Sequence, residues 1–387
     1  MSFCAILPKG LVEKRIGTNM RKALFLSGLM LCVIFSHAVS AVDGDGDGID
    51  DSIDICPYAA GTANSTAGLG CPDSNGDGLA DFEQAVMHDW GDSIKENIDY
   101  GTVGSEVYGL AWAKNNSMFY AGGKDNNVHI FDSMGNHQSF LYSMPGDIYG
   151  IAASPDGAYL VVSSGNGGCR VINATTGALV ADLWNGTSNN GVFEVAWSND
   201  GNRIIAGGGD SIVKWFYTSN WSIERNITDI PGWISAIDTT PDDRMVIFSS
   251  SSQVKGYWSS NGTMALNMTN HTDYVRSLSV SPDGRYIASG SNDNKIIITD
   301  IASQTIVQTI DTLRDVYSLD FSPDGGTLVA AHNREEGILA YRTDTWSSLG
   351  VMDGFGSSNN NRGVYTCLLY TSPSPRDATL SRMPSSA

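Results

Sequence analysis

The stretch YVRSLSVSPDGRYIASGSNDNKIIITD at residues 274–300, followed by TIVQTI at 305–310, is the clearest copy of a unit that recurs along the chain. Versions of it begin at Val107, Ile148, Val192, Ile234, Val275, Val316 and Val364, at intervals of 41 to 48 residues. Each copy reads as four short strands separated by turn residues. Periodicity of this length predicts a repeat architecture built from small sheets.

The turns and the first strand of each unit specify the architecture further. Ser-Pro-Asp-Gly recurs at residues 154–157, 281–284 and 322–325. In a type I turn, Pro suits the second position and Gly the fourth. The first strand places Tyr108 and Trp112 on one face and the small Gly109 on the other. This asymmetry fits the innermost strand of a wedge-shaped blade, so we expect an all-β protein with a β-propeller.

Over residues 107–366 the chain resembles the WD-repeat family. Asn270-His271, Ser289 and Asp293 match three positions of the family's structural hydrogen-bond set, although Thr299 stands at its Trp position. Other units keep an aromatic filler there, without the indole donor: Phe131, Phe216, Tyr257 and Tyr341. The resemblance implies a divergent, WD-like propeller.

Blade number follows from the units that are present. Six units are complete, and a seventh stops after Val364-Tyr365-Thr366. We expect residues 90–366 to be a truncated propeller of at least seven blades, in which residues 93–101 supply the outer strand of the final blade. Closure with six blades is the alternative.

An acidic segment before the repeats, residues 42–89, has the spacing of calcium-binding loops. Oxygen-bearing side chains fall at loop positions one, three, five, nine and twelve, with Gly48 at the turn. The predicted ligands of the first loop are Asp43, Asp45, Asp47, the carbonyl of Ile49, Asp51 and Asp54. Those of the second loop are Asp73, Asn75, Asp77, the carbonyl of Leu79, Asp81 and Glu83. We therefore expect Ca²⁺ as the cofactor.

The charge and the cysteines of the acidic segment are consistent with calcium binding. Ten carboxylates lie between Asp43 and Glu83 without a Lys or Arg, and bound metal would offset their repulsion. In an exported chain Cys56 and Cys71 are expected to form a disulfide. The segment resembles thrombospondin type-3 repeats, which implies a rod-like, calcium-filled spacer. A flexible acidic linker is the alternative.

The two ends of the chain are expected to lie outside the working protein. Residues 1–41, with Met20 as an alternative start, have the basic, apolar and small-residue order of a signal peptide. An uncleaved N-terminal anchor is the alternative, and membrane attachment would need that anchor or a missing C-terminal part. Residues 367–387 resemble a translated transposase-type sequencing adapter, and a Ser/Pro-rich disordered tail is the alternative. From the signal peptide we expect the protein to be secreted or displayed on the cell surface.

Several single residues outside these motifs are candidates for sites. The aromatic residues Tyr108, Tyr149, Phe193 and Tyr317 are predicted to pack between blades rather than to line a recognition channel. Trp233 and Arg276 break that series and are candidates for exposed contacts. Cys169 is expected to be a buried thiol, and the His residues outside the signal and the His271 network are expected at the surface. The rim acids Glu106, Asp147 and Asp315 are expected to be solvated loop residues.

Composition and site chemistry indicate a binding protein. A net charge of −19 makes nucleic acid a poor partner. A propeller enzyme (hydrolase, lyase or quinone-dependent dehydrogenase) would need His, Asp or Glu converging on the axis, and we expect none from these units. We expect a non-enzymatic, calcium-binding module for an extracellular protein or glycan, with a purely structural adhesin as a further alternative. A glycoprotein is expected where the organism glycosylates the sequons at Asn64, Asn115, Asn173, Asn185, Asn220, Asn226, Asn261, Asn267 and Asn270.

Overall fold

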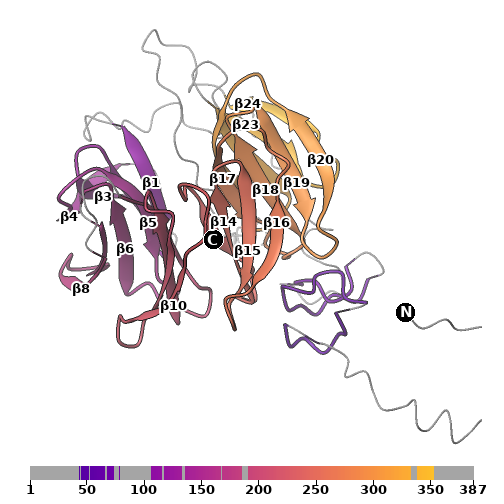
Figure 1. Ribbon diagram of the computed structural model, residues 1–387, viewed down its shortest axis with the longest axis horizontal. Helices are drawn as coiled ribbons and strands as arrows, with labels where there is room; N and C mark the ends of the chain where they lie inside the picture. Colours follow the sequence, from indigo (N-terminus) through magenta and orange to yellow (C-terminus); the bar gives the residue numbers. More distant parts are fainter. Residues whose placement is uncertain are drawn as a thin grey trace, which may run out of the picture. The chain divides into compact units, whose positions relative to one another are not determined.

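The fold is a six-bladed β-propeller. The computed structural model describes residues 43, 45–51, 53–65, 68–73, 78, 106–115, 117–132, 136–166, 168–184, 191–332 and 338–352. Their strands form six four-stranded antiparallel sheets, which follow one another along the chain from magenta to yellow in Figure 1. The predicted all-β propeller is confirmed. The signal peptide, the C-terminal tail and the strands expected at 93–101 and 364–366 lie outside the described residues.

Each sheet runs in chain order from an inner to an outer strand. Blade 1 comprises β1 (Val107–Trp112), β2 (Met118–Gly123), β3 (Asn127–Asp132) and β4 (His137–Ser143). Blade 2 comprises β5 (Ile148–Ala153), β6 (Tyr159–Ser164), β7 (Gly168–Asn173) and β8 (Leu179–Trp184). Blade 3 comprises β9 (Val192–Trp197), β10 (Arg203–Gly208), β11 (Val213–Tyr217) and β12 (Ile223–Ile227).

The remaining blades repeat this order. Blade 4 comprises β13 (Ile237–Thr239), β14 (Met245–Ser250), β15 (Gln253–Trp258) and β16 (Met264–Met268). Blade 5 comprises β17 (Val275–Val280), β18 (Tyr286–Ser291), β19 (Lys295–Asp300) and β20 (Thr305–Asp311). Blade 6 comprises β21 (Val316–Phe321), β22 (Thr327–His332), β23 (Ile338–Arg342) and β24 (Ser348–Met352). Within these ranges no helix is long and apolar enough to span a membrane.

The core lies between neighbouring blades. The first strands β1, β5, β9, β13, β17 and β21 pack against one another in that order. Large buried side chains fill the gaps between sheets, as Trp215 of blade 3 does with Ile234 and Phe248 of blade 4. Each blade thus packs buried side chains against the next blade, and small residues of the first strand, such as Gly109 and Gly150, lie close to the first strand of the following blade.

Blade 4 departs from the predicted repeat. Its first strand begins at Ile237, three residues after the expected start at Ile234, whereas the five other complete units begin where predicted. The amides of Ser235 and Ala236 donate to the hydroxyl of Ser249, at 3.1 and 3.0 Å. A side chain has replaced part of the backbone ladder there, so the regular strand is shortened.

The predicted WD-type network is present in blade 5. His271 bonds through Nδ1 to Asp293 and through Nε2 to Ser289, both at 2.9 Å, and its side chain is 3% exposed. The amide of Thr272 donates to the same carboxylate of Asp293. The network joins the loop before β17 to β18 and to the β18–β19 turn.

Replacing His271 with Ala should destabilise the propeller by about 2–4 kcal/mol, because it leaves the buried Asp293 carboxylate without its imidazole partner. Chemical denaturation followed by intrinsic fluorescence measures the change. The control is Thr309→Ala on the exposed face of the same blade, expected within about 0.5 kcal/mol of wild type. Equal stabilities of the two variants would contradict a structural role for His271.

Candidate functional site

A cavity runs along the axis of the propeller. It has a volume of about 700 Å³ and is lined by residues from or just before the first strand of all six blades. The first residues of these strands lie at one end of the cavity, which we call the mouth. The face of the propeller that carries the mouth is here the channel face, and the opposite one, with the β1–β2-type turns, is the turn face.

Aromatic rings form an arc around the mouth. Tyr108 stacks on Tyr149 with ring centroids 5.3 Å apart, Tyr149 meets Phe193 edge-on at 5.3 Å, and Phe193 meets Trp233 at 6.0 Å. Trp233 is 60% exposed. We call these four residues the aromatic arc. Tyr108, Tyr149 and Phe193, from three successive blades, pack against one another as predicted. They also line the cavity, contrary to the prediction. Trp233 is exposed, as expected for a contact residue.

Three carboxylates line the cavity inside the arc, from Glu194, Asp238 and Asp320. Asp238 accepts from the amides of Thr239 and Val280, each at 2.8 Å. Glu194 accepts from the amide of Val195 at 3.0 Å. The expectation that no acidic groups converge on the axis is therefore wrong.

These three acids occupy the column of small residues on the first strands. Glu194 stands where blades 1 and 2 have Gly109 and Gly150, and Asp238 stands where blade 1 has Ala111. Comparing the six copies position by position would have revealed them. The alternation of large and small residues does not reveal these acids, because the large residues that define the pattern lie on the opposite face of each strand.

Burial dominates the electrostatics of the channel acids. It raises the pKa of Glu194 to about 8, with a further upward contribution from the charge of Asp238. It also raises the pKa of Asp238 to about 6, against the lowering effect of the two amide donors. Within the described residues, no Lys, Arg or His forms an ion pair with Glu194 or Asp238.

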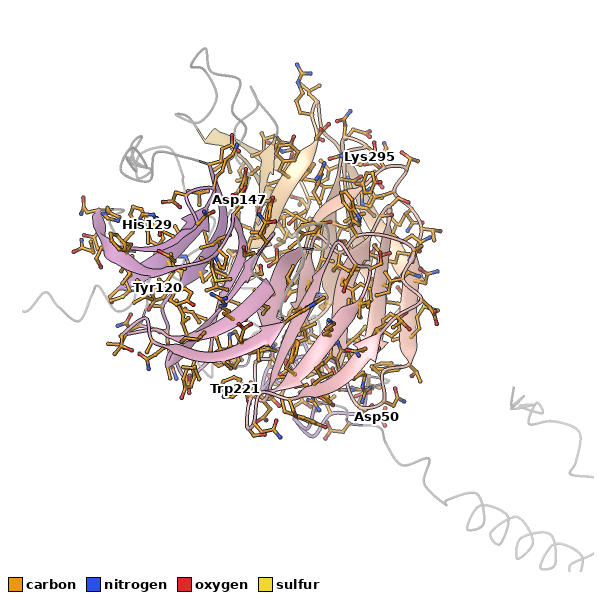
Figure 2. The ribbon with its side chains drawn as sticks, turned by 60° about the vertical axis from the view of Figure 1, so that its left-hand side comes forward. Asp50, Tyr120, His129, Asp147, Trp221 and Lys295 are labelled. Atoms are coloured by element: carbon orange, nitrogen blue, oxygen red, sulfur yellow. A yellow bond between two sulfur atoms is a disulfide. The ribbon has the colours of Figure 1, made fainter. Side chains whose placement is uncertain are left out.

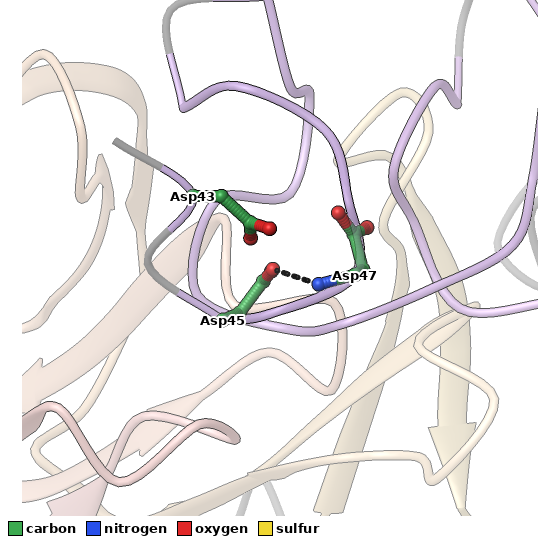
Figure 3. Close-up of side chains that lie close together, drawn as sticks. All are labelled: Asp43, Asp45 and Asp47. Carbon is green, nitrogen blue, oxygen red and sulfur yellow. Dashed lines mark hydrogen bonds between the residues drawn. The ribbon is translucent and has the colours of Figure 1, made fainter. Parts of the chain in front are cut away.

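In the first acidic loop, three predicted ligands come together. The carboxylates of Asp43, Asp45 and Asp47 have oxygens within 4.8 Å of one another, and Figure 3 shows them gathered around the inside of one loop. Gly46 and Gly48 have φ of 83° and 94°, and their amides donate to Asp43 at 2.8 and 3.0 Å. The glycines thus allow the left-handed turns that bring the carboxylates together.

The other predicted ligands of this loop lie in different surroundings. Asp51 forms an ion pair with Arg244 of blade 4 at 3.4 Å. Asp54 is buried, and one of its oxygens accepts from the amide of Cys56 at 2.7 Å. Burial, together with the neighbouring carboxylates, raises the pKa of Asp54 to about 6. The amide of Ile49, whose carbonyl is a predicted ligand, donates to Asp47 at 2.8 Å.

The second loop repeats one contact of the first. The amide of Gly78 donates to Asp73 at 2.8 Å, as the amide of Gly48 does to Asp43, and Gly78 has φ of 89°. Asn75, Asp77, Leu79, Asp81 and Glu83 lie outside the described residues. A disulfide joins Cys56 to Cys71 between the two loops.

The acidic segment is anchored to the turn face of blades 4 and 5. Arg244 bonds to the carbonyl of Pro57 at 3.3 Å and lies over the rings of Tyr58 and Trp258. The carbonyl of Tyr58 accepts from the amide of Asp242 at 2.9 Å. Arg244 supplies the cation that the segment itself lacks, and no sequence signal pointed to it.

The segment and the channel mouth therefore lie at opposite ends of the propeller. Figure 2 shows the same separation for two labelled residues: Asp147, which precedes β5, lies at one rim, and Trp221, in the β11–β12 turn, lies at the other, toward Asp50. The described part of the acidic segment, held on the turn face, therefore lies away from the mouth.

The remaining candidates are structural or partly exposed. Cys169 is fully buried, as predicted, and burial raises the pKa of its thiol. The prediction of surface His residues is wrong for His129 and His332, which are 5% and 0% exposed. His129 bonds to Asp125 at 2.6 Å and to His137 at 2.9 Å. These contacts cross from β3 to the β2–β3 turn and to β4, so the local spacing of His residues does not reveal them.

Comparison with protein families identifies WD40 repeats, described as "WD domain, G-beta repeat", at residues 99–132, 138–173, 180–216 and 258–300. The last three matches run from the outer strand of one blade through three strands of the next. The chain thus contains WD40 repeats within a six-bladed propeller, a class that typically serves as an interaction or scaffold module. No match was found among curated proteins.

Proposed function

We propose that this protein is a non-enzymatic interaction module that binds a segment of an extracellular protein at the mouth of its axial channel. The aromatic arc carries the proposal, because it joins Trp233, which is exposed, to a cavity of about 700 Å³ on the channel face. Rings that are half-buried before binding lose little conformational freedom on contact, which favours them as anchors in interfaces.

Trp233→Ala should abolish capture of an extracellular or envelope protein by the immobilised full chain, because loss of a central aromatic anchor costs about 2 kcal/mol or more. The measurement is a pull-down, followed by affinity determination with the purified partner. Trp221→Ala on the turn face is the matched control and should bind like wild type. Equal loss in both variants, or in neither, would refute the mouth as the binding site. If the partner is a glycan, the protein would instead bind to a glycan array.

We further propose that the acidic segment binds Ca²⁺ as a stiff spacer between the propeller and whatever precedes it. Ligands at about 2.3–2.6 Å on opposite sides of Ca²⁺ lie within about 5 Å of each other, which suits the spacing of the three gathered carboxylates. Oδ2 atoms of Asp45 and Asp54 are buried without a hydrogen-bond partner among the described residues. Asp43, Asp45, Asp47 and Asp54 would hold the ion, and Asp51 would link the loop to Arg244.

The same proposal includes export to the cell surface or medium. The disulfide between Cys56 and Cys71 supports it, since such bonds persist in oxidising compartments. Detection of the chain in the medium or on intact cells, with that bond present under non-reducing conditions, tests it.

An enzyme remains the second candidate, because a buried carboxyl with a pKa near 8 in a channel has the properties of a general acid. Activity screens with ester, glycoside and uronate substrates separate the two functions. Turnover that Glu194→Gln removes would favour an enzyme over a binding module.

A further inference from the structure

We propose that His129 and His137 of blade 1 form a binding site for a divalent transition-metal ion of the Cu²⁺ or Ni²⁺ type, with Asp125 as the positioning residue behind His129. Nδ1 of His129 lies 2.9 Å from Nε2 of His137. The two residues belong to β3 and to the outer strand β4, and Figure 2 shows His129 at the outer edge of the propeller. The site is thus separate from the channel mouth and goes beyond the proposed function.

A β-bulge turns His137 toward His129. Ile130 of β3 pairs with Ser139 of β4, whereas the next residue of β3, Phe131, pairs with His137. One residue of β4 is therefore extra at this point. In an even register His137 would lie on the opposite face of the sheet from His129. Phe131 meets the ring of His137 edge-on, with centroids 5.3 Å apart, and supports it in this position.

Blade 1 differs from the other blades at both His positions. The pairing of second and third strands places at the position of His129, in blades 2 to 6, Arg170, Lys214, Lys255, Ile297 and Leu339. The pairing of third and fourth strands places at the position of His137 Leu179, Ile223, Met264, Ile306 and Ser348. Two facing imidazoles are therefore a property of blade 1 and not a requirement of the fold.

Asp125, in the β2–β3 turn, fixes the orientation that His129 needs as a ligand. Its Oδ2 lies 2.6 Å from Nε2 of His129, which is 5% exposed. A carboxylate only accepts, so Nε2 carries the proton and Nδ1 presents its lone pair toward His137. A carboxylate on the far nitrogen of a metal-bound His holds the ring and makes it more basic. On metal binding, the half-buried His137 would move its proton from Nε2 to Nδ1 and turn its free lone pair to the ion.

The separation of the two nitrogens indicates the kind of ion. At metal–nitrogen distances of about 2.0–2.1 Å, nitrogens 2.9 Å apart subtend an angle of about 90° at the metal. Square-planar and tetragonal sites, which Cu²⁺ and Ni²⁺ favour, have this angle between neighbouring ligands. Tetrahedral Zn²⁺ would need a separation of about 3.3 Å. Among the described residues no third His, Cys, Asp or Glu joins the pair, so water would complete the coordination.

The test is a titration of the full, untagged chain with Cu²⁺ in excess Ca²⁺, followed by calorimetry and by electron paramagnetic resonance. Wild type should show a site with two coordinated nitrogens. His137→Ala should weaken binding by more than about a hundredfold, beyond the usual effect of a supporting residue. Asp125→Asn should weaken it by about tenfold and keep the two-nitrogen signal, because Asp125 positions a ligand without touching the ion.

Ser139→Ala, at an exposed neighbour on β4, is the control and should bind like wild type. Equal Cu²⁺ affinity and equal spectra in wild type and His137→Ala would overturn the site, and so would equal losses in His137→Ala and Ser139→Ala. Urea denaturation without metal checks that the variants fold, and His137→Gln replaces His137→Ala if that variant does not. A loss of stability in the His137 variant with unchanged Cu²⁺ binding would make the pair a structural hydrogen bond only.

Discussion

Chelation of calcium from the full chain is expected to make the acidic segment susceptible to proteolysis and to remove hydrogen-exchange protection from the amides of Gly46 and Gly48. These amides donate to Asp43, whose carboxylate lies against those of Asp45 and Asp47. Without a cation between them, the three groups repel one another and the loop loosens. At a free Ca²⁺ concentration of about 100 Kd, binding stabilises the folded loop by about 2.7 kcal/mol.

Two variants of this segment separate metal binding from net charge. Asp45→Asn replaces Oδ2, a proposed ligand atom that is buried without a hydrogen-bond partner among the described residues, and it should abolish calcium binding in isothermal titration calorimetry. Asp50→Asn removes the same charge from a residue outside the predicted ligand set and should bind calcium nearly as well as wild type. If calcium gives no binding heat and chelation leaves the proteolysis pattern unchanged, the segment is only an acidic linker.

The second large effect concerns Glu194. Its carboxyl holds a proton up to a pH of about 8 in the folded protein, whereas in the unfolded chain it loses that proton above its ordinary pKa near 4.5. Between these values the folded state binds more protons, so the contribution of Glu194 to stability falls as pH rises. Because Gln cannot ionise, the Glu194→Gln variant does not lose this stability as the pH rises.

Glu194→Gln should therefore equal wild type in stability near pH 4 and exceed it increasingly up to about pH 8. The full pKa shift would correspond to several kcal/mol, and we expect solvent screening to reduce the difference in stability to about 2 kcal/mol. Urea denaturation at a series of pH values provides the measurement.

Glu224→Gln is the matched control for this experiment. Glu224 is a buried acid that forms an ion pair with Arg203 at 2.7 Å, so its replacement should destabilise the protein at neutral pH. A Glu194→Gln variant that is no more stable than wild type at pH 8 would contradict the high pKa.

Features that depend on neighbouring residues could be predicted from the sequence. The Ser-Pro-Asp-Gly turns and the alternation of Tyr108, Gly109 and Trp112 follow from local backbone geometry, and they predicted the propeller and most strand starts. The His271 network was predicted through a resemblance in which each residue has a known place in the repeat. The gathering of Asp43, Asp45 and Asp47 likewise lies within one short loop, where spacing determines which side chains can meet.

Features that join distant segments could not be predicted in this way. Arg244 and Asp51 are 193 residues apart, and their ion pair depends on how the segment lies on blade 4. The convergence of Glu194 and Asp238 depends on the packing of neighbouring first strands around an axis.

The sequence by itself determined the repeat, the strand order within each blade and the spacing of acidic ligands, because these depend on backbone preferences over a few residues. The tertiary structure alone decided which faces the repeats turn toward one another. Packing of the six first strands around one axis brings the carboxylates of Glu194, Asp238 and Asp320, together with the rings at the mouth, to the wall of one channel.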